Sequence, residues 1–284
     1  MIPQFALRLI FGMSLTWCVM PKRDVTSGFF RIQMLVTMGL GVLATLTLGP
    51  LSSFESSGSG LFFRDRFLGD PTLGLYVITI GATIASFLGS VMWTLERRAA
   101  GIRYAFVVLA ASAIGLMLET WGRESVIPHG VQTEYIDGFP SISMKVSAVP
   151  FWFQLLTEFS GGWIIGGAIS TMLLGHWYLT ATGMPIAPLQ QLNALLLGAV
   201  IVRTLLAAAV FGWAPPLTQS TQWVWLALRW AGLIGPVILV PMVFRVLRYR
   251  NTQSATGVLY AIDILIFLGE TTAALLAHEL MCPF

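Results

Sequence analysis

Residues 71–95 read PTLGLYVITIGATIASFLGSVMWTL, and this stretch contains no charged side chain. An α-helix rises about 1.5 Å per residue, so about 20 apolar residues cross the hydrocarbon core of a bilayer, which is roughly 30 Å thick. Similar stretches recur along the whole chain, in which 56% of the residues are hydrophobic and 10% are charged. A soluble chain could not cover its surface with so few charges. The sequence therefore predicts an all-α, polytopic integral membrane helix bundle.

We expect about eight transmembrane helices and treat residues 1–284 as a single transmembrane domain. The predicted spans cover residues 3–20, 28–49, 71–95, 102–120, 149–179, 186–212, 221–245 and 254–281. Tryptophan is enriched where a helix meets the membrane–water interface. Six tryptophans lie near the proposed ends: Trp17, Trp121, Trp152, Trp177, Trp213 and Trp223. The alternating segments of about ten residues that are typical of membrane β-barrels are absent from the sequence.

The charges between the spans predict the orientation of the chain. The connections after the first, third and seventh spans carry eight Lys and Arg residues, whereas the opposite connections carry four. Because cytoplasmic connections carry an excess of Lys and Arg, the first set is expected inside and both termini outside. The longest outer loops are then about 50–70 and 121–148. The first segment has no signal-peptide features, so we expect a retained helix and a bacterial inner (cytoplasmic) membrane.

Several kinds of functional site find no support in the sequence. The basic residues form short clusters and no continuous face, which argues against nucleic acid as a partner. Cys18 and Cys282 are expected at opposite membrane faces and show no metal-binding spacing. His176 and His278 are also expected at opposite faces, which argues against a bis-histidine haem. Because hydrolase and P-loop signatures are missing too, we assign no catalytic or metal-binding residue and expect no catalytic activity of the isolated chain.

Ionisable residues inside the predicted spans carry the functional prediction. A charge in hydrocarbon is costly unless it is paired, so it usually faces the bundle interior and often marks function. Four such residues are expected at similar depth in the outer half of different spans: Glu158, Arg203, Arg229 and Glu270. Arg8 is expected nearer the outer surface. Two interpretations stay open: the pairs lock helices together, or they surround an outer-facing polar cavity for an anionic or quinone-like ligand or a proton path.

Further polar residues could form a proton path. Asp263 and Glu270 are seven residues apart and lie on one stripe of a helix. Carboxylates in such a row serve as proton relays in pumps and transporters, although buried acids are also often simply paired. His176 follows Glu158 by 18 residues, or five turns, and returns to the same face near the inner end. Glu158 lies four residues before Gly162 in a GxxxG step, which lets two helices approach closely.

The layout resembles that of the membrane-anchor subunits of the polysulfide-reductase type. The shared features are eight spans, few histidines, buried charges near the outer side and long outer loops. The resemblance implies a haem-free subunit that exchanges quinone with an iron–sulfur partner. We therefore expect an integral membrane subunit of a respiratory or electron-transfer complex, quinone-interacting or scaffolding. Quinone is the candidate cofactor, and the loop 121–148 is the candidate docking surface for an outer-face protein.

A proton- or ion-coupled secondary transporter is the alternative function. Asp263 and Glu270 would be its coupling carboxylates, and the proline-containing span 221–245 would be a moving element. Residues 23–28 and 250–257 both open a span with hydroxyl residues followed by glycine. Helix capping explains this similarity, and a repeated helical hairpin, as in many transporters, would explain it as well.

Overall fold

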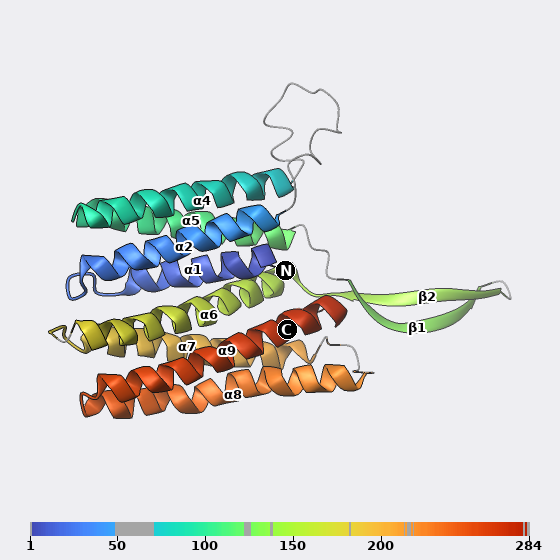
Figure 1. Cartoon of the computed structure of the whole chain (residues 1–284). Coiled ribbons are helices and arrows are strands. Elements are labelled where there is room, and N and C mark those ends of the chain that lie inside the picture. Colours follow the sequence, from blue (N-terminus) through green and yellow to red (C-terminus); the bar gives the residue numbers. More distant parts are fainter. Residues whose placement is uncertain are drawn as a thin grey trace, which may run out of the picture.

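A computed structural model describes residues 2–48, 71–121, 126–136, 139–181, 183–212, 214, 217, 219–280 and 282. Within these residues the chain forms the eight expected helices, all running along one axis of a single bundle (Figure 1). The helices are α1 (Ile2–Val19), α2 (Ser27–Thr47), α4 (Pro71–Thr94), α5 (Arg98–Trp121), α6 (Phe151–Thr180), α7 (Ala187–Val210), α8 (Ser220–Arg248) and α9 (Thr252–Leu280). The prediction of a polytopic helix bundle is therefore confirmed.

The bundle has the surface and the interior of an integral membrane protein. Among the described residues, all helices except α6 are long and apolar enough to cross a membrane. Large apolar side chains such as Leu46, Ile84 and Ile264 are exposed on the outside of the bundle, where lipid would cover them. Helix α6 packs against α1, α5, α7 and α9 and is buried over more than half of its length. Its central place explains why it carries glycine, serine and glutamate instead of a continuous apolar face.

The eight helices divide into two halves with the same pattern of neighbours. In the first half α1 packs on α2 and α5, and α4 packs on α2 and α5. In the second half α6 packs on α7 and α9, and α8 packs on α7 and α9. The tight turns that join α4 to α5 and α8 to α9 each contain a residue with φ 55°, Glu96 and Arg250. In chain order, α2 of the first half therefore corresponds to α7 of the second, and α5 corresponds to α9. The stretch 23–28 precedes α2 and the stretch 250–257 begins α9, so these two stretches do not occupy corresponding places.

The two halves meet where α1 crosses α6, and glycine permits the close approach. A Cβ atom on Gly12 would collide with the carbonyl oxygen of Gly162 and lie 2.9 Å from Cα of Gly166. A Cβ atom on Gly162 would lie 2.9 Å from the carbonyl oxygen of Arg8. One offset of 150 residues relates Gln4 to Gln154, Arg8 to Glu158 and Gly12 to Gly162. The crossing therefore brings Arg8 of one half next to Glu158 of the other.

The segment 121–148 contains a β-hairpin, where the sequence analysis expected only a loop. Strands β1 (Val126–Ile136) and β2 (Phe139–Ala148) pair antiparallel, with an irregularity between Pro128 and Val131. The hairpin projects away from the bundle at the end where both termini lie (Figure 1). The Asp137–Gly138 dipeptide between the two strands is a strong hairpin signal that sequence reasoning overlooked. The other long loop of the prediction, 50–70, lies outside the described residues.

Candidate functional site

Three of the predicted charges meet in the core of the second half. Arg203 of α7 donates to Glu270 of α9 twice, from Nε to Oε1 at 2.9 Å and from Nη2 to Oε2 at 2.9 Å. Arg229 of α8 donates from Nη1 to the same Oε1 atom. All three side chains are at most 2% exposed. The two bonds from Arg203 and the bond from Arg229 pair the Glu270 side chain with both arginines and tie three helices together.

The fourth predicted charge, Glu158, pairs with residues of α1. Arg8 Nε donates to Glu158 Oε2 at 2.6 Å, and Gln4 Nε2 donates to Glu158 Oε1 at 2.6 Å. Gln4, Arg8 and Glu158 are 8%, 7% and 7% exposed. Gln4 and Arg8 are one helical turn apart, so both side chains reach the same carboxylate from one face of α1. This pair therefore joins the two halves of the bundle across the glycine crossing.

Gly161 marks the place where the two groups of charges meet. A Cβ atom on this residue would lie 3.2 Å from Glu270 Oε2, 3.7 Å from Arg203 Nη2 and 3.7 Å from Arg8 Cζ. The electrostatic field at Arg8 also includes Glu270 and, from α5, Glu119. The structure therefore brings the four predicted residues together with Arg8. We call these five residues the charge cluster: Arg8, Glu158, Arg203, Arg229 and Glu270.

Asp263 and His176, the other two predicted site residues, lie outside the charge cluster. Asp263 precedes Glu270 by seven residues on α9, which is a rise of about 10 Å. It is half-buried, and its Oδ1 atom has no hydrogen-bond partner within the described part of the chain. His176 is exposed near the far end of α6, where its Nδ1 atom lies 3.4 Å from the hydroxyl of Tyr260. Within the described part of the chain no hydrogen bond or ion pair links these side chains to Glu270, so they are candidates for a separate role.

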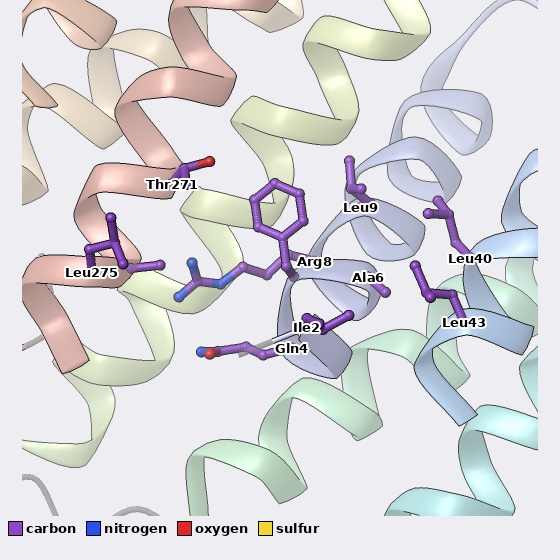
Figure 2. Close-up of a pocket in the computed structure, with 11 residues that line it drawn as sticks. Ile2, Gln4, Ala6, Arg8, Leu9, Leu40, Leu43, Thr271 and Leu275 are labelled. Carbon is purple, nitrogen blue, oxygen red and sulfur yellow. The ribbon is translucent and has the colours of Figure 1, made fainter. Parts of the chain in front are cut away.

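A cleft of about 400 Å³ opens beside the Arg8–Glu158 pair. Its walls come from the N-terminal half of α1, from α2 and from α9 (Figure 2). The lining residues are Ile2, Gln4, Phe5, Ala6, Arg8, Leu9, Leu40, Leu43, Thr271, Ala274 and Leu275. Because Ile2 and Leu43 are exposed on the outside of the bundle, the cleft opens sideways, toward the lipid. An apolar cleft of this size with a few convergent polar groups is typical of a site for a small molecule.

Arg8, Gln4 and Thr271 supply the polar groups of the cleft. The guanidinium of Arg8 and the amide of Gln4 extend from α1 toward α9 in Figure 2, and the hydroxyl of Thr271 points from α9 toward α1. The neighbouring Thr272 hydroxyl donates to the backbone oxygens of Leu268 and Gly269. The Thr271 hydroxyl has no such bond to any described residue, so it remains available to a ligand. Hydrogen-bond donors thus stand on both walls of the cleft.

Sequence reasoning missed the cleft residues for an identifiable reason. The in-span charge of Arg8 is visible in the sequence, but Gln4 and Thr271 are not among the predicted site residues. The spacing of Gln4, Arg8 and Gly12, four residues apart on one face, was the available signal. Thr271 offers no comparable signal, because only the packing of α9 beside α1 and α2 places it opposite Arg8.

The described residues contain no group of three His, Cys, Asp or Glu side chains that could hold a metal ion. The polar groups of the cleft are the hydrogen-bonding side chains of Arg8, Gln4 and Thr271 in an otherwise apolar lining. Comparisons with protein-family models, with curated proteins and with solved structures gave no match.

Proposed function

We propose that this integral membrane protein binds a quinone-like amphiphile in the cleft between α1, α2 and α9. The observation that carries the proposal is an apolar, laterally open cleft with Arg8 at its polar end. A quinone ring carries two carbonyl acceptors on opposite sides. Arg8 and Gln4 can donate to one carbonyl from α1, and the Thr271 hydroxyl can donate to the other from α9. The apolar lining suits the ring and the first part of an isoprenoid tail, and the tail leaves through the lateral opening.

We further propose that the protein acts as a subunit of an electron-transfer complex of a bacterial inner membrane. The β1–β2 hairpin supports this proposal, because it projects from the bundle at the end where the N-terminus lies and α1 begins (Figure 1). An isolated two-stranded hairpin is marginally stable in water, so contact with a partner protein would stabilise it. In this proposal the partner exchanges electrons with the bound quinone.

Purification in mild detergent is the first test of the proposal. Co-purifying polypeptides are identified by mass spectrometry, and lipid-soluble molecules are extracted and examined by absorption. We expect stoichiometric quinone and at least one further polypeptide. Replacement of residues 126–148 by a short Gly–Ser linker should release the polypeptide and leave the melting temperature of the bundle unchanged. A single polypeptide with no extractable quinone would contradict both parts of the proposal.

Titration with a short-chain quinone tests the position of the site. Leu275→Trp should fill the cleft and weaken binding at least tenfold, whereas Leu268→Trp places the same side chain on an exposed position of α9 outside the cleft and serves as the control. Thr271→Val removes one hydroxyl at nearly constant volume and should weaken binding by roughly 2- to 10-fold, as expected for one neutral hydrogen bond. Equal affinities for all three variants would place the quinone elsewhere.

A secondary transporter remains the second candidate, and the division into two halves favours it. Many transporters bind their cargo at the interface of two structural repeats, and here charged groups of both halves meet at the α1–α6 crossing. Uptake of small organic anions into proteoliposomes under a pH gradient tests this function. Uptake should be lost in Asp263→Asn if Asp263 couples it to protons. Unchanged uptake in that variant would remove Asp263 from the mechanism.

A further inference from the structure

We propose that Asp263 is a proton-binding site that exchanges its proton, through Tyr260 and His176, with the end of the bundle opposite the two termini. The site lies outside the cleft between α1, α2 and α9, and the inference does not depend on which ligand that cleft takes. It assigns a role to two predicted residues, Asp263 and His176, that lie outside the charge cluster.

The first observation is that Asp263 has no partner among the described residues. Its Oδ1 atom is buried without a hydrogen bond, and no ion pair joins the side chain to an arginine in the described part of the chain. Glu158 and Glu270 differ, because each is bonded to at least one arginine. Asp263 is half-buried in the middle of α9, and the next residue, Ile264, is 67% exposed on the lipid-facing surface. A carboxylate without a counter-charge is strongly disfavoured at such a depth, so the stable form of Asp263 there is the neutral acid.

The titratable groups on the neighbouring helices are engaged elsewhere, except for His176. Helices α6 and α8 pack along α9, and α1 touches it through Phe5. With the thiol of Cys18 aside, the charged and titratable side chains of these three helices are Arg8, Glu158, His176, Tyr178, Arg229, Arg245 and Arg248. Arg8, Glu158 and Arg229 belong to the charge cluster, as does Glu270 of α9 itself. Tyr178 donates to the backbone oxygen of Pro185. Arg245 and Arg248 are exposed in the last turn of α8, and His278 and Glu279 are exposed in the last turn of α9. His176 therefore is the group that reaches α9 within one turn of Asp263.

Tyr260 and His176 lead from Asp263 to the end of the bundle that lies opposite the termini (Figure 1). His176 is exposed near the end of α6, and its Nδ1 atom lies 3.4 Å from the hydroxyl of Tyr260. Tyr260 precedes Asp263 by three residues, so both side chains lie on one face of α9. The Cβ atoms of two residues so spaced are about 5–6 Å apart. A tyrosine hydroxyl and one water can bridge this gap and pass a proton in either direction.

An aromatic pair lies on the other side of Asp263, between this residue and the cleft. Phe267 follows Asp263 by four residues on the same face of α9, and its ring packs edge-on against Phe5 with the ring centroids 5.7 Å apart. Phe5 lines the cleft, and so does Thr271, one further turn along α9. Because the two rings separate Asp263 from the polar end of the cleft, the proton reaches Asp263 from the His176 end.

Dicyclohexylcarbodiimide, an apolar reagent that dissolves in lipid, tests for the proton on Asp263. The O–H of a protonated carboxylic acid adds across one C=N bond of the reagent, and the adduct rearranges to a stable N-acylurea. In proteoliposomes we expect peptide mass spectrometry to find the label on Asp263 and not on Glu158 or Glu270, which are paired with arginines. Asp263→Asn should lack this label, whereas Glu279→Gln, at an exposed carboxylate of the last turn of α9, should keep it. Wild-type protein without a label on Asp263 would overturn the inference.

Separate control of the pH on the two sides of oriented proteoliposomes tests the route. The orientation is measured by maleimide labelling of Ser220→Cys. Labelling of Asp263 should fall about tenfold per pH unit as the solution at the His176 end becomes alkaline, and it should not respond to the pH at the end that holds the termini. A response to the pH at the termini, or to neither side, would overturn the proposed access.

The rate of the response tests the part played by Tyr260. After a pH jump, infrared spectroscopy follows the loss of the carbonyl band of the protonated acid, which is assigned by its absence in Asp263→Asn. Tyr260→Phe keeps the ring but removes the hydroxyl, and it should slow this loss by about tenfold or more. Tyr249→Phe is the matched control, because Tyr249 is 83% exposed in the turn before α9. Equal rates in the two variants would remove Tyr260 from the route.

Discussion

Removal of the negative charge of Glu270 should destabilise the bundle more than any other single change of charge. In Glu270→Gln the carboxylate that Arg203 and Arg229 share becomes a neutral amide, and both arginines stay in a core where they are at most 2% exposed. Breaking a buried ion pair by removing one partner costs about 3–5 kcal/mol, because an uncompensated charge is left behind. At roughly 2 °C per kcal/mol for a chain of this size, the melting temperature should fall by about 6–10 °C.

Thermal unfolding in detergent, followed by tryptophan fluorescence, measures this shift. Glu96→Gln is the matched control, because Glu96 is exposed in the turn between α4 and α5, and its melting temperature should stay within about 1 °C of the wild type. The double variant Arg229→Gln with Glu270→Gln should be less destabilised than the sum of the two single variants, since it removes charges of both signs from one contact. A melting temperature of Glu270→Gln equal to that of the wild type would refute the reasoning, because it would mean that Glu270 is not the counter-charge of the two arginines.

Three further predictions concern packing, orientation and thiol chemistry. Gly12→Ala should lower the melting temperature by about 2–6 °C, because overpacking at the crossing costs about 1–3 kcal/mol. Gly39→Ala is the control and should leave the melting temperature unchanged, because a Cβ atom there meets nothing within 4 Å. Equal melting curves for the two variants would contradict the close crossing of α1 and α6. If the termini face outward, a membrane-impermeant maleimide should label Ser220→Cys in intact cells and should label Arg250→Cys only after permeabilisation. The reverse labelling pattern would show that the termini face the cytoplasm. Burial raises the pKa of the Cys282 thiol to about 12. Since the thiolate is the reactive form, maleimide labelling in a Cys18→Ala variant should be slow at pH 7 and should accelerate about tenfold per pH unit up to pH 9. Rapid labelling at pH 7 would show that Cys282, 1% exposed in the structure, is open to water.

The transmembrane helices could be predicted because each one depends on local composition. A stretch such as 71–95 must bury about 20 apolar residues and satisfy its own backbone hydrogen bonds, and in lipid an α-helix achieves both within one segment. The hairpin 126–148 was missed because a β-strand needs a partner strand, and the partly polar strands β1 and β2 show little hydrophobic pattern. Only the Asp137–Gly138 turn signal pointed to it.

The sequence predicts which charged residues belong to the candidate site, but it does not predict how their side chains are arranged. Depth and sign alone group Glu158, Arg203, Arg229 and Glu270, because an unpaired charge in hydrocarbon is too costly to persist. The same reasoning gave equal weight to Asp263, which the structure leaves about 10 Å along α9 from Glu270. Helical periodicity places residues on a face but does not say which other helix that face meets.

The sequence by itself determined that this protein is an integral membrane helix bundle, since hydropathy and span length are properties of each segment alone. Only the tertiary structure decided that the helices form two halves with the same pattern of neighbours, that glycines let α1 cross α6 in close contact, and that Arg8 of the charge cluster also lines a lipid-facing cleft. The physical reason is that the apolar composition of a segment is enough to insert it into lipid as a helix, but it does not specify which other helices that segment packs against. The neighbours of each helix are determined by close packing at small residues and by the pairing of buried charges between segments up to 150 residues apart in the sequence.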